Sequence, residues 1–426
     1  MAKLIFYKTL ANIRKKHGLS QEEFAKSLGC TVEHIKLLES NKEQASFVFT
    51  TQLKDKFNLH DAPITESERA ALMDGLYKWK LSIDYGDVSS AAEVMTELAK
   101  NTNASFSPSA QIFYTLYAAS YYWEVNDMKA FEETMTAIGS RRDEFSARHQ
   151  YFYHRLVGAS KYKARCYNES LKAYEMARKL DKNSEWGDVG FFYSYGRCLS
   201  DMGYTVRAIR FLQMAQHLAK YSKIYHDKPN SRYDAYIDGY MAYNLSKLDE
   251  TGDAFDILDR RLSLEKKKTG ANEEIGFIYL SLGRVYFRKE NYSKAQSNFE
   301  KAEEYLNKKG EAYKTNLYYK AFTLIASGKV PEGLDCVKIG VKISTCEQWK
   351  NLFNALKHSA SLSAPKSLSY MKKTAISMLQ ESGQYEDAMD YYKVIGEFYD
   401  KGTDCAMAVF YYKLLQFYKE IIEKEI

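Results

Sequence analysis

A pattern of small and large side chains recurs along most of this chain, and it constrains the fold more than any other feature. In the clearest copy, small residues stand twelve positions apart at Gly283 and Ala295, with large residues at Tyr286, Tyr292 and Phe299. Small residues at two such positions let antiparallel helices approach closely, and the large residues fill the space around their crossing. The pattern therefore predicts a helical hairpin over residues 279–306.

Weaker and stronger copies of this pattern repeat at intervals of 38 to 55 residues. The residue equivalent to the first small position falls at Trp79, Ala118, Gly158, Gly196, Ala242, Gly283, Ala321 and Ile376. Copies in phase over this length are similar to tetratricopeptide (TPR) repeats, whose helical pairs stack into a superhelix. The widest interval leaves room for a loop or an extra helix around residues 346–365, and a helix over residues 406–425 would cap the array. Only 5 prolines occur in 426 residues, which favours long helices because an interior proline breaks a helix.

Residues 1–60 differ from the repeats. They contain ten Lys and Arg against six Asp and Glu, so most of the formal net charge of +6 lies there. Concentrated positive charge is typical of nucleic-acid contact, although a solvated lysine-rich face has the same composition. Ser20 and Glu23 are spaced as a capping box at the start of one helix, Gly29 provides a turn, and Thr31 can cap the next helix. Helix, glycine-containing turn and helix together predict a helix-turn-helix.

The run GLSQEEFAKSLGCTVEHIKLLES resembles the Cro/C1-type (XRE) helix-turn-helix family, over roughly residues 5–59. The resemblance implies that the third helix enters the major groove of double-stranded operator DNA. The residues that would face DNA are Gln21, Thr31, Val32, Glu33, His34 and Lys36. Glu33 and His34 depart from the small or basic residues that are common at these positions, and Ser40-Asn41-Lys42 replaces the usual turn. The alternative is a domain retained for protein contacts.

A TPR array exposes a concave groove, and such grooves commonly hold extended peptides. Repeat positions and their neighbours predict a basic and aromatic lining made by Arg155, Tyr193, Arg197, Tyr243, Asn244, Arg284, Asn316 and Tyr318. A guanidinium group suits a carboxylate, and paired asparagine amides can clamp a peptide backbone. The alternative is that the arginines form ion pairs with glutamates across the superhelix.

A helix-turn-helix followed by a long TPR array resembles the RRNPP family (Rap, Rgg, NprR, PlcR and PrgX), over essentially the whole chain. Size and repeat count are similar to those of NprR-like members. The resemblance implies a cytoplasmic quorum-sensing transcription regulator, switched by a short signalling peptide in the groove and acting as a homodimer. Two other functions remain open, a modulator that binds a response regulator and a TPR adaptor that does not bind DNA.

The expected fold is therefore all-α, with a helix-turn-helix domain at residues 1–60, a linker at 61–68 and a right-handed TPR solenoid at 69–426. The solenoid would hold about seven to eight hairpins and a C-terminal capping helix. The six cysteines are scattered, the histidines lack metal-ligand spacing, and no phosphate-binding glycine loop occurs. No stretch approaches the roughly 20 apolar residues that span a bilayer. We expect no catalytic residue, cofactor, metal site or membrane contact.

Overall fold

The structure is a computed structural model. It describes residues 10–40, 49, 53, 56–57, 66–84, 87–101, 108–181, 189–221, 233–270, 272–402 and 404–424. Within these ranges the regular elements are helices, without a strand. The chain divides into two compact units, residues 1–150 and 151–426. The expected all-α class, with a helix-turn-helix followed by helical repeats, is confirmed.

The first unit contains the helix-turn-helix and the first helical pairs. Residues 10–16 are helical. The elements that follow are α2 (Gln21–Ser27), α3 (Val32–Glu39), α5 (Glu66–Asp84), α6 (Val88–Asn101), α7 (Pro108–Glu124), α8 (Met128–Gly139) and the 3₁₀ helix η1 (Arg142–Glu144). Because α5 begins at Glu66, the last three residues of the expected linker 61–68 are helical, and 61–65 lie outside the described residues.

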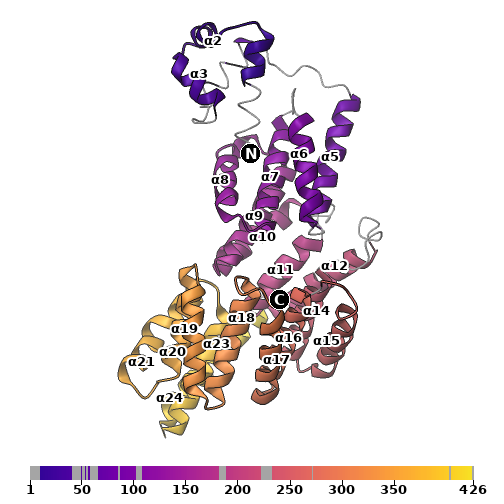
Figure 1. Ribbon diagram of the computed structural model, residues 1–426. Coiled ribbons are helices and arrows are strands. Elements are labelled where there is room, and N and C mark those ends of the chain that lie inside the picture. The colour runs from indigo at the N-terminus through magenta and orange to yellow at the C-terminus, as the bar shows by residue number, and fades with distance from the viewer. Residues whose placement is uncertain are drawn as a thin grey trace. The chain divides into compact units, whose positions relative to one another are not determined.

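The second unit continues the array of helical pairs, most of which are neighbours along the chain (Figure 1). Its helices are α9 (Ala147–Lys163, which begins before the division), α10 (Tyr167–Leu180), α11 (Val189–Met202), α12 (Thr205–Tyr221), α14 (Tyr233–Lys247), α15 (Thr251–Glu265), α16 (Asn272–Arg288), α17 (Tyr292–Tyr305), α18 (Glu311–Ala326), α19 (Val330–Ile343), α20 (Glu347–Ser359), α21 (Pro365–Tyr370), the π-helical η2 (Met371–Ala375), α22 (Ile376–Glu381), α23 (Tyr385–Lys401) and α24 (Cys405–Lys424). Helices α20 and α21 occupy the widest repeat interval, and α24 lies where the capping helix is expected.

The small residues of the repeat pattern lie where two helices touch. A Cβ atom built on Gly283 of α16 would lie 2.3 Å from the ring of Phe299 on α17. A Cβ on Gly158 would meet the ring of Tyr174 in the same way, at 2.7 Å. Glycine is needed at these positions because the partner helix already occupies the volume of any larger side chain.

Seven of the helical pairs turn through one residue with a positive φ angle, two residues before the second helix begins. Among the described residues these are Asn126, Arg165, Gly203, Asp249, Glu290, Gly328 and Gly383. Each follows a predicted small position by seven residues, except that Asn126 follows Ala118 by eight. The Ala118 assignment is therefore one residue out of phase, and the fully buried Ala119 takes its place. Accordingly, the buried residue twelve positions further on is Phe131 rather than Ala130.

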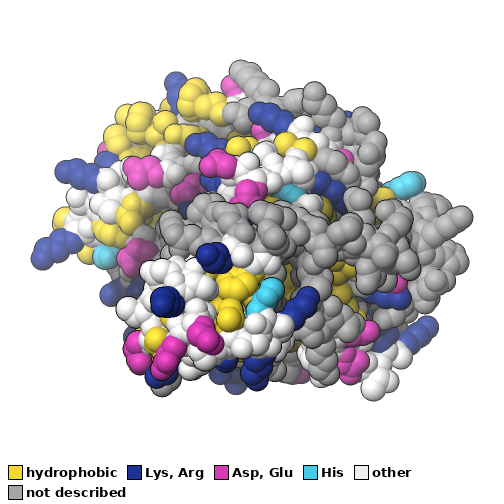
Figure 2. All heavy atoms as spheres, turned by 90° about the horizontal axis from the view of Figure 1, so that it is seen from above, with side chains coloured by type: hydrophobic (Ala, Val, Ile, Leu, Met, Phe, Trp, Pro, Cys, Tyr) yellow, Lys and Arg dark blue, Asp and Glu magenta, His cyan; other side chains and the backbone are white. Residues whose placement is uncertain are grey.

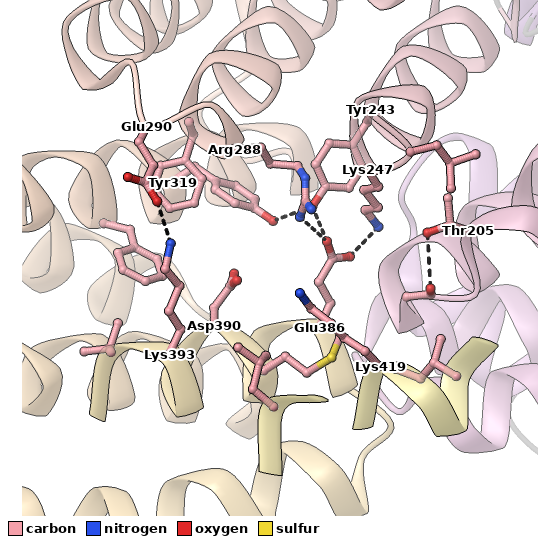
Figure 3. A pocket seen from close by; sticks show the side chains of 18 of the residues that line it. Thr205, Tyr243, Lys247, Arg288, Glu290, Tyr319, Glu386, Asp390, Lys393 and Lys419 are labelled. Atoms are coloured by element: carbon pink, nitrogen blue, oxygen red, sulfur yellow. Dashed lines mark hydrogen bonds and ion pairs between the residues drawn. The ribbon is translucent and has the colours of Figure 1, made fainter. Parts of the chain in front are cut away.

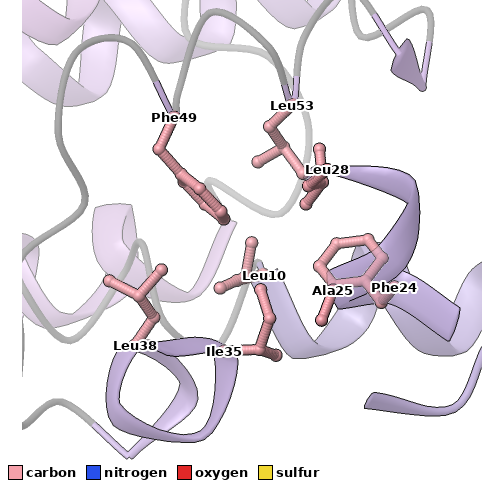
Figure 4. Packing of buried hydrophobic residues seen from close by; sticks show 8 residues of the cluster. All are labelled: Leu10, Phe24, Ala25, Leu28, Ile35, Leu38, Phe49 and Leu53. Atoms are coloured by element: carbon pink, nitrogen blue, oxygen red, sulfur yellow. The ribbon is translucent and has the colours of Figure 1, made fainter. Parts of the chain in front are cut away.

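The helix-turn-helix has its own apolar core. Eight buried side chains converge in Figure 4, and they are Leu10, Phe24, Ala25, Leu28, Ile35, Leu38, Phe49 and Leu53. They come from the first helix, from α2, from α3 and from the chain beyond α3. Burial on this scale, at roughly 25 cal/mol per Å² of apolar surface, fixes α3 against α2 and leaves the other face of α3 outward.

Candidate functional site

The two helices of the helix-turn-helix are held by their N-terminal caps. The Ser20 hydroxyl accepts from the Glu23 amide at 3.1 Å, and the Ser20 amide donates to the Glu23 carboxylate at 2.8 Å. The Thr31 hydroxyl accepts from the His34 amide at 3.2 Å. Gly29, between the helices, has a φ of +64°, a conformation that costs glycine least. The predicted capping box and turn are confirmed.

Helix α3 presents only part of the predicted DNA-contact set to solvent. Its exposed members are Thr31, Glu33 and Lys36. Glu33 and Lys36 are three residues apart and therefore share one face of the helix. Val32 and His34 are half-buried, since Val32 packs on the apolar core and the His34 ring lies 5.4 Å from the ring of Phe49.

Gln21, the sixth predicted contact, is held by a partly buried polar network. Its side-chain amide donates to the Glu39 carboxylate at 2.7 Å. The guanidinium of Arg14 donates to both oxygens of Glu39, at 2.6 and 3.0 Å, and to the Leu19 carbonyl oxygen at 3.0 Å. Burial alone would raise the pKa of Glu39, but the hydrogen bonds from Arg14 and Gln21 lower it below its usual value. Arg14 is thus neutralised within the domain and is not available to bind phosphate.

Charge is mixed on the face shown in Figure 2. Lys and Arg side chains are interspersed with Asp and Glu over the described part of that face. A phosphate contact there would depend on individual lysines or arginines rather than on one continuous basic patch.

The second unit contains a cavity of about 380 Å³ that is open to solvent on one side. Its lining comes from α12, α14, α16, α18, α23 and α24, so residues more than 200 positions apart face the same space. Figure 3 shows charged side chains and tyrosines pointing into it. A cavity of this size is within the range of small-ligand sites.

Glu386 of α23 forms the polar centre of this cavity. It accepts from the Tyr243 hydroxyl at 2.5 Å and from the Lys247 ammonium at 2.6 Å, and Arg288 lies 3.5 Å away (Figure 3). Burial would raise the pKa of Glu386, but Lys247, Arg288 and Arg284 together lower it. These contacts fasten α23 to α14 and α16 from within the array.

The eight predicted peptide contacts do not all reach this cavity or the smaller space beside it. Tyr243 lines the large cavity. Arg284 and Tyr318 line a smaller space of about 40 Å³ between α11, α16, α18 and α23. Arg155, Tyr193, Arg197, Asn244 and Asn316 line neither.

The two asparagines are used between helices rather than as clamps facing a groove. Both are fully buried. The Asn244 amide donates to the Ser200 hydroxyl at 2.8 Å and to the Tyr240 carbonyl, and the Asn316 amide donates to the Phe299 carbonyl at 3.0 Å. Their position in the repeat turns them towards the neighbouring helix. Repeat spacing alone did not distinguish residues that face a neighbouring helix from residues that face the groove.

Two of the three predicted arginines, Arg284 and Arg197, differ in their partners. The guanidinium of Arg284 lies 3.5 Å from the ring centroid of Tyr243 and 3.5 Å from the Asp201 carboxylate. That ion pair supports the alternative in which an arginine pairs across the superhelix. Arg197 stacks instead on Tyr162, with 4.0 Å to the ring centroid, and no carboxylate of the described chain forms an ion pair with it.

A polar contact closes the array upon itself, and the sequence pattern did not predict it. Arg165, in the turn between α9 and α10, donates to Gln384 and Asp387 at the start of α23, both at 2.6 Å. Its guanidinium also lies 4.3 Å from the ring centroid of Trp349. Asn168 donates to the carbonyl of Glu381 at 3.0 Å, which extends the same contact. Arg165 is the only arginine among the positive-φ turn residues of the described chain. An arginine at that turn position was the signal in the sequence that could have indicated this contact.

No group of three or more His, Cys, Asp or Glu in the described ranges is arranged to hold a metal ion. None of the helices described is both long enough and apolar enough to cross a bilayer.

Known proteins are similar to the helix-turn-helix segment and to most of the chain as a whole. Residues 10–47 match the helix-turn-helix family HTH_3. Over 415 residues the chain is 20% identical to the transcriptional activator NprA of Geobacillus stearothermophilus, a match that covers 92% of this chain and 98% of that protein.

Solved structures share the fold at low sequence identity. A Rap protein complexed with competence and sporulation factor has a TM-score of 0.70 and 13% identity, covering 84% of this chain and 100% of that one. NprR in complex with its cognate peptide NprX has a TM-score of 0.67 and 16% identity, covering 81% and 98%. A helix-turn-helix joined to the repeat fold of Rap and NprR is the architecture of the RRNPP regulators, and this chain has that architecture.

Proposed function

We propose that this protein is a cytoplasmic transcription regulator that binds operator DNA through its helix-turn-helix and is switched by a short peptide bound inside its second unit. The observation that carries the proposal is the helix-turn-helix match within a chain that is similar to a transcriptional activator over almost its whole length. The proposed activity is binding, without catalysis.

The DNA-contact set is sharpened by the geometry of α3. We infer that Thr31, Glu33 and Lys36 touch DNA, because they are exposed at the start and along one face of the helix. Lys36 suits a phosphate or a guanine edge, and Glu33 can accept from cytosine N4. Gln21 and Arg14 would position α3 through Glu39.

Peptide control is a linkage between two sites. A peptide shifts the regulator only through different affinities for two conformations. The contacts of Arg165 and Glu386 hold α23 against the turn after α9 and against α14 and α16. Glu386 lines the cavity, so a ligand that enters it must either use or disturb the contacts of Glu386. We infer that the ligand acts on this closure and that a homodimer brings two helix-turn-helix domains to paired half-sites.

A salt titration tests the DNA part. Full-length protein is first used to select duplexes from a randomised library, and affinity for a selected duplex is then measured from 50 to 200 mM salt. We expect log K to fall linearly with log salt, since each phosphate contact releases counterions. Failure to retain any duplex, or a slope near zero, would reject DNA regulation in favour of a TPR adaptor.

A response-regulator partner remains a separate prediction. The shared Rap fold favours it only at the level of architecture. Mixing the purified chain with receiver domains from its own organism, followed by size-exclusion chromatography, tests it, and the absence of any co-eluting complex would remove this candidate.

A further inference from the structure

Ion pairing inside the large cavity leaves one half-buried acidic group, Asp390, without an ion pair to the described chain. Glu386 is paired with Lys247, and Lys393 with Glu290 at 2.6 Å and with Glu397 at 3.8 Å. Asp390, one turn after Glu386 on α23, lines the same cavity without a hydrogen bond or ion pair to the described chain. In Figure 3 its carboxyl group points into the open space and carries no dashed line.

Aromatic rings line the same cavity as this carboxyl group. Phe287, Tyr292, Tyr319 and Phe322 line the cavity with Asp390. The ring of Phe287 is central, with centroid distances of 5.1 Å to Phe322, 5.5 Å to Tyr319 and 6.1 Å to Tyr292. Aromatic faces beside a carboxylate attract cations, because the ring quadrupole and the negative charge act in the same direction.

The cavity's own cations form no ion pair with Asp390 within the described chain, although the charges of Arg288 and Lys393 favour its ionised form. Arg288 is directed to Glu386, and Arg207 pairs with Glu175 at 2.8 Å. Lys419 of α24 is exposed and forms no ion pair with the described chain. The cavity therefore offers a carboxyl group without an ion pair to the described chain, and Lys393 and Lys419 line the same space (Figure 3).

We propose that Asp390 and the neighbouring aromatic rings bind a cationic group of the peptide ligand, either a lysine or arginine side chain or the free amino terminus. This inference rests on the proposed peptide-binding function, and it names the chemistry that selects the peptide. Binding of a cation would supply the counter-charge that the fold leaves out, and the cavity is large enough for a side chain to enter.

Protonation gives an independent readout. Burial first, and then repulsion from Glu386, raise the pKa of Asp390 to about 7. A bound cation favours the ionised carboxylate, so binding near neutral pH releases a proton. Calorimetry of peptide binding in two buffers of different ionisation enthalpy measures that release.

The experiment selects random heptapeptides with free amino termini on the full-length protein and on two variants. Asp390→Asn removes the charge with little change of shape. Asp400→Asn, an exposed position on the same helix, is the matched control. Selected peptides are then synthesised with lysine replaced by norleucine, or with an acetylated amino terminus, so that the two sources of the cation are separated.

We expect the wild type and Asp400→Asn to select peptides with a required cation, whose removal weakens binding about 10-fold or more. In Asp390→Asn the ratio of the affinities for the cationic peptide and its neutral analogue should fall to about one, and proton release on binding should disappear. Selected peptides that need no cation would overturn the inference while leaving peptide binding intact. An equal loss of affinity for charged and neutral peptides in Asp390→Asn would also overturn the inference. If the wild type selects no peptide, the proposed function itself fails.

Discussion

The unpaired carboxyl group of Asp390 has a consequence for stability that can be measured without any ligand. Its pKa is raised from an ordinary 3.8 to about 7, first by burial and then by Glu386. The folded chain therefore binds more protons than the unfolded chain between these pH values. The stability that this group contributes is complete below pH 3.8 and is lost as the pH rises through 7.

The magnitude follows from the size of the shift. At 1.36 kcal/mol per pKa unit, a shift of about three units destabilises the fold by about 4 kcal/mol once Asp390 is ionised. Partial exposure to solvent lowers this value, so we expect Asp390→Asn to stabilise the free protein by about 2 to 4 kcal/mol at pH 8. At pH 5 the folded wild type is protonated at Asp390, and the advantage of the variant should fall to about 1 to 2 kcal/mol.

Hydrogen exchange followed by mass spectrometry measures this difference in stability between variant and wild type locally, on fragments of α23. The variant should be more protected than the wild type at pH 8, and the difference should narrow at pH 5. Asp400→Asn, exposed on the same helix, should change neither value. A less protected Asp390→Asn protein at pH 8 would refute the reasoning, because it would mean that Asp390 is paired in solution.

Other substitutions test the repeat geometry, the closure and the DNA contact. Gly283→Ala should destabilise the second unit by at least about 1 to 3 kcal/mol through overpacking. Gly252→Ala, with nothing within 4 Å of its added Cβ, should not destabilise it. Equal shifts in melting temperature for the two variants would contradict the repeat geometry. Arg165→Ala leaves Asp387 buried and unpaired, and should cost about 3 to 5 kcal/mol in local hydrogen exchange at the start of α23; unchanged protection there would mean that the array is open. Lys36→Ala should reduce the salt slope of DNA binding by about one, and an unchanged slope would remove Lys36 from the phosphate contacts.

The helical hairpins could be predicted from sequence because their determinants are local. A small residue such as Gly283 and the ring of Phe299 lie sixteen positions apart and meet across one turn. The prediction was out of phase at Ala118, because two adjacent alanines there fit the template equally well. The structure resolved this through the turn at Asn126, whose position is set by the backbone rather than by residue size.

The site was less predictable than the hairpins. Repeat positions indicated an inward-facing basic and aromatic surface, and Tyr243, Arg284 and Tyr318 do line interior spaces. Asn244 and Asn316 do not, because an asparagine one position away from the groove-facing direction points into the helix interface. No pattern indicated Glu386 or Asp390, since their importance depends on which cations of other helices reach them.

The sequence by itself determined the all-α class, the helix-turn-helix and the order of the helical pairs, because each depends on caps, turns and contacts within about forty residues. Only the tertiary structure decided which residues meet across the array. Arg165 and Asp387 are separated by 222 positions, and they meet because small rotations at each repeat accumulate until α23 returns to α9. The same accumulation creates the cavity and leaves Asp390 within it unpaired.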